Sequence, residues 1–171
     1  SRYMENLKIQ LETQYKKAFF SKIKEDLSKN PPDVEHITVI INELVTALCK
    51  FVPNKPEIHI LIKSDIVCET IGEETMPRII ERFIHWIEQF QAPTHDSVTK
   101  SWRDNYKKAT NYAEFISQFL EEYYNHTEMV YKEVWEARKR ISNNESAVPP
   151  EHRVIVNGKN GVPEQMKSGL R

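Results

Sequence analysis

A double proline followed by an aspartate separates two stretches in which apolar residues recur at helical spacing. The first stretch repeats every four residues, through Leu7, Leu11, Tyr15, Phe19, Ile23 and Leu27. The second repeats at intervals of three and four between Val34 and Phe51. Proline fixes φ and has no amide hydrogen for a helix ladder, so Pro31 and Pro32 must end the first helix, and Asp33 is placed to cap the next. The pattern predicts an α-hairpin, with one helix over about 5–29 and another ending at Pro53.

The segment 57–63 is ambiguous between strand and helix. Alternation of Ile58, Ile60 and Ile62 is typical of a strand, whereas the spacing from Ile58 through Leu61 and Ile62 fits a helix. We favour a helix because Asn54 is placed to cap it and Pro56 suits a first turn. We expect it to stop at Gly72.

The remaining pattern also predicts helices. Thr75 is expected to cap a fourth helix that carries Pro77 in its first turn and closes before Pro93. A shorter helix should hold Trp102. The pair Asn111 and Glu114 then predicts the start of a long last helix that runs to about residue 141, roughly 45 Å at 1.5 Å per residue.

These elements define an all-α protein, an irregular bundle of about six helices with a long C-terminal helix. We expect the bundle domain to span 4–141, and we interpret the three residues before Met4 as an added sequence. Residues 142–171, rich in proline, glycine and asparagine, should form a flexible tail that is disordered or ordered by a partner. A small hairpin around Asn157-Gly158 is the alternative there.

Charge and cysteine content narrow the functional classes. A formal net charge of −1 provides no overall field for nucleic acid, so we expect no nucleic-acid partner. No apolar run reaches the roughly 20 residues of a membrane span. The two cysteines, Cys49 and Cys68, both lie within apolar helical patterns, and no signal-peptide pattern precedes them. The sequence therefore favours buried thiols and a cytoplasmic location.

No catalytic or cofactor motif is found in the chain. HExxH, Walker and GxGxxG patterns are missing, so we predict a protein that is not an enzyme and holds no cofactor. Two Glu-x-x-x-His pairs, Glu81 with His85 and Glu122 with His126, share a helical face, as metal ligands would. We interpret them as ordinary polar pairs because the further carboxylates of a helical metal site are missing.

The long last helix supplies the candidate protein interface. Its tyrosine-rich face tolerates either a core or a half-hydrated surface, and its C-terminal end carries a basic cluster. The same cluster also complements the negative end of the helix dipole, which leaves both interpretations open. The candidate interface residues are Tyr123, Tyr124, Tyr131, Trp135, Arg138, Lys139 and Arg140.

The order of features resembles the N-terminal part of the T-complex protein 11 family over residues 16–130. Four stretches carry the resemblance: Ala18-Phe19-Phe20 through Pro31-Pro32-Asp33, Glu43-Leu44 through Pro53, Ile58 through Asp65-Ile66, and Phe83-Ile84 through Ala92-Pro93-Thr94-His95-Asp96. His95 stands where the family pattern has arginine, and the family domain is much longer. A weaker similarity continues from Tyr112 to Met129.

The resemblance implies an all-helical, non-enzymatic protein and transfers no catalytic residues. Some members of the family are linked to cyclic AMP and protein kinase A signalling. We therefore expect a protein-interaction or regulatory module with a protein partner. The alternative is a structural or assembly protein, viral or otherwise, that self-associates through its helices and tail as a homo-oligomer. In either case Pro31, Pro32 and Asp33 serve as a structural turn and cap.

Overall fold

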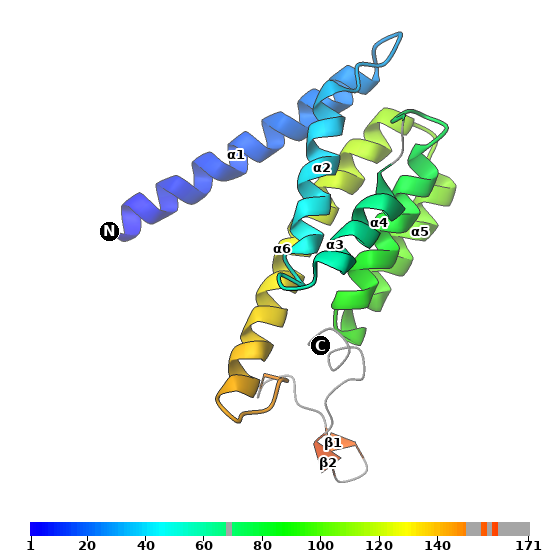
Figure 1. Ribbon diagram of the computed structural model, residues 1–171. Coiled ribbons are helices and arrows are strands. Elements are labelled where there is room, and N and C mark those ends of the chain that lie inside the picture. The colour runs from blue at the N-terminus through cyan, green and yellow to red at the C-terminus, as the bar shows by residue number, and fades with distance from the viewer. Residues whose placement is uncertain (68–69, 150–154, 157–158, 161–171) are drawn as a thin grey trace.

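The computed structural model describes residues 1–67 and 70–149, together with residues 155–156 and 159–160. Within these residues the protein has an all-α fold, as predicted, with six α-helices and one short 3₁₀ turn (Figure 1). The helices are α1 (Arg2–Leu27), α2 (Glu35–Cys49), α3 (Pro56–Ile66), α4 (Met76–Phe90), α5 (Asp96–Lys108) and α6 (Tyr112–Ser142), with the turn η1 (Pro93–His95) before α5.

The predicted tail falls largely outside the described residues. Within it, strands β1 (Ile155–Val156) and β2 (Lys159–Asn160) pair antiparallel. Cys68 and the residue after it also lie outside the described residues, whereas Cys49 is a buried free thiol. Burial raises the pKa of the Cys49 thiol.

Helices α1 and α2 form the predicted hairpin around the double proline, where the Asn30–Pro31 peptide is cis. The Asp33 carboxylate accepts a hydrogen bond from the Glu35 amide at 3.0 Å. However, Val34 occupies the N-cap position, so Asp33 is not the cap residue itself. Asp33 lies one residue before the N-cap and accepts a hydrogen bond from an amide in the first turn of α2.

A buried carboxylate, Asp26, holds the two helices of the hairpin together. Its side chain is 1% exposed and lies 3.0 Å from Lys29 Nζ, 3.1 Å from Lys22 Nζ and 2.7 Å from His36 Nδ1. Its backbone carbonyl also accepts from the Asp33 amide at 2.9 Å. The hydrogen bond from Lys29, with those from Lys22 and His36, lowers the pKa of Asp26 to about 2. Asp26 therefore stays ionised at the α1–α2 junction.

The ambiguous segment 57–63 is helical, within α3, and Pro56 occupies its first turn as predicted. Two of the expected signals act differently. Lys55 rather than Asn54 stands at the N-cap, and α3 already ends at Ile66 instead of reaching Gly72. Gly72 belongs to the following turn, where its amide donates to Thr75 Oγ1 at 2.9 Å.

The two remaining predicted caps, Thr75 and Asn111, differ in what their side chains do. Thr75 stands at the N-cap of α4, but its hydroxyl makes no cap hydrogen bond and donates backward to the Thr70 carbonyl at 2.8 Å. Asn111, in contrast, caps α6 as predicted: its side chain accepts from the Glu114 amide at 3.0 Å.

Helix α6 is the central support of the bundle. It packs against α1, α2 and α4, and α3 lies against both α2 and α4. Figure 1 shows that α2 to α5 gather around the first part of α6, while the start of α1 and the end of α6 project beyond them. One face of α4 is buried in the core through Met76, Ile79, Ile80, Phe83, Ile84, Ile87 and Phe90. The two projecting ends leave side chains accessible, and the candidate site lies beside the first of them.

Candidate protein-binding groove

A hollow opens where α1 separates from the bundle. It has a volume of about 760 Å³ and is lined on the α1 side by Leu11, Tyr15 and Phe19. Helices α2 and α6 form the other wall, with Ile40 and Tyr124 among the lining residues. Apolar and aromatic side chains from three helices therefore face one open concavity.

A second hollow, of about 710 Å³, continues the first along α2 and α6. Both are lined by Glu43, Tyr124 and Glu128, and the second extends from Val39 to Lys50 along α2. We call the two hollows together the α1/α2/α6 groove. Its length and mixed aromatic, aliphatic and carboxylate lining are typical of a surface that receives a helix.

Lys16 fixes α1 at the mouth of the groove. Its ammonium lies 3.4 Å from Asn125 Oδ1 and 3.6 Å from a Glu128 carboxylate oxygen. It also sits 4.5 Å from the centre of the Tyr124 ring, a cation–π contact. Burial, together with the neighbouring Glu128, raises the pKa of Tyr124 to about 12. Tyr124 therefore presents a neutral ring to the groove.

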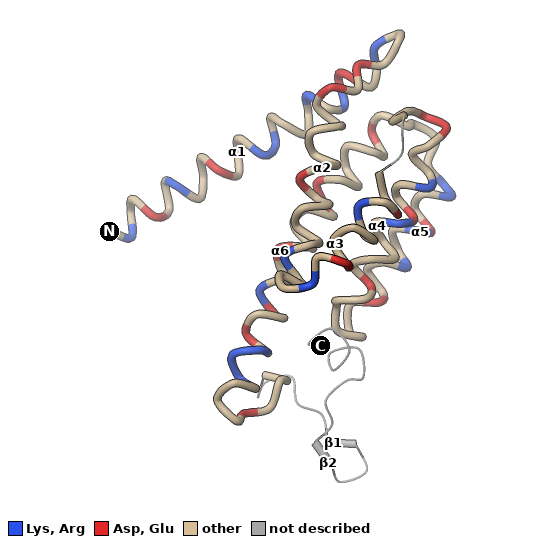
Figure 2. The backbone as a smooth tube through the Cα atoms, in the orientation of Figure 1, with Lys and Arg blue, Asp and Glu red and all other residues tan. Residues whose placement is uncertain are grey.

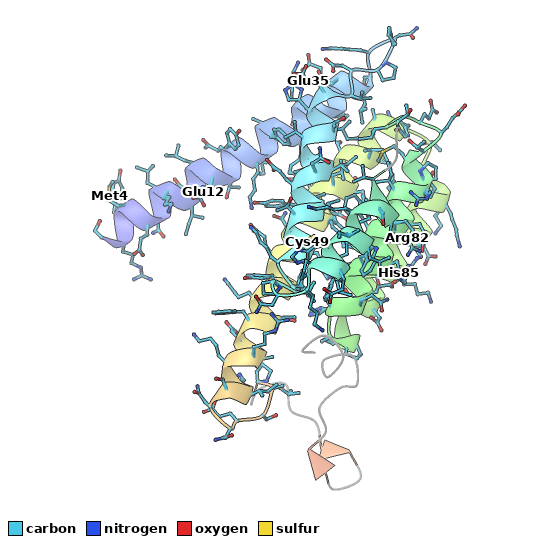
Figure 3. The ribbon with its side chains drawn as sticks, viewed as in Figure 1. Met4, Glu12, Glu35, Cys49, Arg82 and His85 are labelled. Carbon is cyan, nitrogen blue, oxygen red and sulfur yellow. The ribbon has the colours of Figure 1, made fainter. Side chains whose placement is uncertain are left out.

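The part of α1 that precedes Lys16 is exposed along its whole length. Met4, Leu7, Leu11 and Tyr15 follow one another at spacings of three and four and are 59%, 36%, 58% and 73% exposed. Figure 3 shows Met4 and Glu12 on this projecting part, well away from the other helices. We call Met4–Tyr15 the projecting segment. Its apolar seam runs directly into the groove, because Leu11 and Tyr15 belong to both.

One predicted interface residue, Tyr123, is a core residue. Its side chain is fully buried, and its hydroxyl donates to the Phe83 carbonyl at 2.7 Å. Its ring packs 5.0 Å from that of Phe83 and 5.7 Å from that of Trp102. Including Tyr123 in a surface is therefore wrong, because its side chain packs against α4 and α5 instead of lining the groove.

Three other predicted interface aromatics are accessible. Tyr124 and Tyr131 line the groove, and Tyr131 is 38% exposed while its ring meets Phe51 edge-on. Trp135 lies one turn further along α6 and is 53% exposed. The structure thus brings Tyr124 and Tyr131 together and leaves Trp135 beyond the groove.

The basic cluster does not act as one patch. Arg138 is half-buried and donates to the Phe51 carbonyl, which ties α6 to the end of α2. Lys139 is exposed and Arg140 half-buried, both in the last turn of α6. This position favours their interpretation as partners of the negative helix end.

The first Glu-x-x-x-His pair does not converge on a shared point. Glu81 accepts from Arg103 Nε at 3.1 Å, whereas His85 meets the Trp86 ring edge-on. Each member thus has a different neighbour.

The members of the second pair, Glu122 and His126, also have different neighbours, and His126 is buried whereas Glu122 is exposed. Glu122 accepts from Trp102 Nε1 at 3.1 Å, and His126 Nε2 lies 2.8 Å from Gln91 Oε1. Burial, with a smaller effect of His95, lowers the pKa of His126 to about 4. Among the residues that the structure describes, no three His, Cys, Asp or Glu side chains are placed to hold a metal ion.

The residues of α1 that line the groove are not among the predicted interface residues, all of which lie on α6. The apolar repeat placed Leu7, Leu11 and Tyr15 in the same stripe as Phe19 and Ile23, which pack on the bundle. One signal was available. A repeat of four drifts around a helix of 3.6 residues per turn, so the early and late members of the stripe cannot face the same neighbour.

Comparisons with protein-family models, with curated proteins and with solved structures gave no match. Over the described parts of the chain, no helix is long and apolar enough to cross a membrane.

Proposed function

We propose that the protein is a non-enzymatic helical interaction module that binds a protein partner in the α1/α2/α6 groove. One observation carries the proposal: the apolar seam of the projecting segment is exposed and continues into a groove lined by apolar and aromatic side chains. Contiguous exposed apolar surface of this kind is typical of protein-binding sites. No catalytic or cofactor role is assigned to any residue.

The regulatory part of the proposal rests on the T-complex protein 11 resemblance. The four stretches that carry it fall within or beside α1 to α4, and two of these helices, α1 and α2, line the groove. We extend the proposal to cyclic AMP and protein kinase A signalling in the cytoplasm. Titration of the purified chain against protein kinase A subunits tests this extension, and saturable binding is expected.

A second candidate function is structural or assembly self-association. The observation that favours it is the projecting segment itself, which lies outside the bundle with its seam uncovered by the described residues. A chain that carries both an uncovered helical seam and an open groove has the two halves of a self-complementary contact.

A matched pair of substitutions tests the proposed surface. Leu11→Glu places a charge in the seam, and Leu61→Glu places the same charge on α3, outside the groove. The two leucines are similarly exposed, at 58% and 52%. Both variants should keep the helical circular dichroism of the wild type.

The variants should differ in binding. L11E should lose the partners that the wild type retains in affinity capture, and L61E should keep them. If L11E retains every partner that the wild type retains, the groove is not the binding surface.

A further inference from the structure

We propose that the occupant of the groove is the projecting segment of a second copy of this chain. Two chains would exchange Met4–Tyr15 about a twofold axis, each segment lying in the groove of the other. This inference rests on the proposed function, because it uses the same groove, and it names the partner.

The segment and the groove match in length. Met4 to Tyr15 covers eleven helical steps, and the groove follows α2 from Val39 to Lys50, again eleven steps. At 1.5 Å per residue each is about 17 Å long. A helix of this length therefore spans the groove.

The chemistry of the two surfaces also matches. The seam offers Met4, Leu7, Leu11 and Tyr15 at spacings of three and four, the pattern by which an amphipathic helix enters an apolar groove. The groove offers aliphatic and aromatic partners from α2 and α6, with Val39 48% exposed. Neither surface is covered by the described residues of its own chain, and the exchange buries both.

One pair of opposite charges joins the projecting segment of one copy to the groove of the other. Lys8 lies beside the seam, near the middle of the projecting segment, and its side chain is 77% exposed. Glu43 lies near the middle of the groove, where both hollows share it. In the orientation that turns the Lys8 side of the segment toward α2, Lys8 of one copy comes to Glu43 of the other. Figure 2 shows Lys and Arg alternating with Asp and Glu along the projecting part of α1.

The arrangement closes on itself. Leu11 and Tyr15 line the chain's own groove as well as belonging to the segment that leaves it. In a twofold pair each copy gives its segment to the other and receives the other's segment in its own groove, which makes the contact isologous. A closed dimer results, with no uncovered seam to extend it into a filament.

A charge exchange between two variants tests the pairing. Lys8→Glu and Glu43→Lys each create two like-charge contacts in their own homodimer, and each should weaken the dimer Kd by about tenfold. In a mixed dimer of one K8E chain and one E43K chain, both contacts between positions 8 and 43 again join a carboxylate to an ammonium. The mixed dimer should therefore regain the wild-type Kd to within about twofold.

Sedimentation equilibrium gives the Kd of each homodimer, and energy transfer between differently labelled variants gives that of the mixed dimer. Lys100→Glu and Glu57→Lys, on exposed positions of α5 and α3, are the matched control pair and should leave the Kd unchanged alone and mixed.

Three results overturn the exchange. The first is a wild type that stays monomeric at about 200 µM. The second is a dimer whose Kd is unaffected by the double substitution Leu7→Glu with Leu11→Glu. The third is a mixture of K8E and E43K that binds no more tightly than either variant alone. These results do not reject the proposed function. That function is rejected by a different result, namely that L11E retains in affinity capture every partner that the wild type retains.

Discussion

The two halves of α1 share one apolar repeat but lie in different surroundings. In the second half, Phe20, Ile23 and Leu27 are at most 6% exposed, packed in the core of the bundle. In the first half, Leu7, Leu11 and their neighbours are exposed. An apolar repeat at helical spacing therefore indicates a face that packs against another surface. It does not say whether that surface belongs to the same chain.

Helix α6 differs from α1 because it keeps a buried face along its later part. Tyr123 is buried against α4 and α5, and Tyr131 and Trp135 are exposed, but Val130 and Val134 beside them are 0% and 2% exposed. In α6 burial differs between faces of the helix, whereas in α1 it differs between halves, and in our account the exposed half of α1 builds the contact with a second chain.

The largest expected contrast is in stability along α1. Ile23→Ala should lower the free energy of unfolding by about 2–5 kcal/mol, because it leaves a cavity at a fully buried site. Leu11→Ala should change it by less than about 0.5 kcal/mol in the monomer. Urea unfolding followed by circular dichroism at low protein concentration measures both. Equal costs for the two substitutions would remove the distinction between the halves.

A smaller contrast is expected between two tyrosines of α6. Tyr123→Phe removes the hydroxyl that donates to the buried Phe83 carbonyl and should cost about 1–2 kcal/mol. Tyr131→Phe alters an exposed side chain and should cost less than about 0.5 kcal/mol. The same urea titration applies, and a Tyr123→Phe protein as stable as the wild type would argue against the hydrogen bond.

Acid should affect the two halves of α1 differently. The pKa of Asp26 is lowered to about 2 from 3.8, so the ionised carboxylate stabilises the folded state above pH 3.8. That contribution is lost as the pH falls through about 2. Asp26→Asn should therefore flatten the dependence of the unfolding free energy on pH between these limits.

The control for this prediction lies in the exposed half. Glu12→Gln removes an exposed carboxylate that lies 4.0 Å from Lys8. It should leave the dependence of the unfolding free energy on acid pH close to that of the wild type. If the unfolding free energy of the Asp26→Asn protein depends on acid pH as that of the wild type does, Asp26 is not the group that causes this dependence.

The helices could be predicted from the sequence because proline breaks and apolar periods are local signals. Asn111 was identified as a cap for the same reason, since its partner Glu114 is three residues away. The expectations for Asn54 and Gly72 are wrong because many polar residues and glycines suit a helix end, and the local sequence does not select among them.

The polar core and the groove could not be predicted in this way. Asp26 meets His36 ten residues away, and His126 meets Gln91 thirty-five residues away, so no local pattern links either pair. Tyr123 and Tyr131 belong to the same apolar pattern of one helix, and only the fold shows that Tyr123 packs against Phe83 and Trp102 while Tyr131 stands beside Phe51 at the groove.

Hydrogen–deuterium exchange at two protein concentrations tests whether the first half of α1 serves association and the second half serves folding. Amides of residues 20–27 should be protected at both concentrations. Those of residues 4–15 should exchange rapidly near 1 µM and become protected by about tenfold or more near 200 µM, as the segment enters the groove of a second chain. Protection of residues 4–15 that is the same at both concentrations would contradict the account.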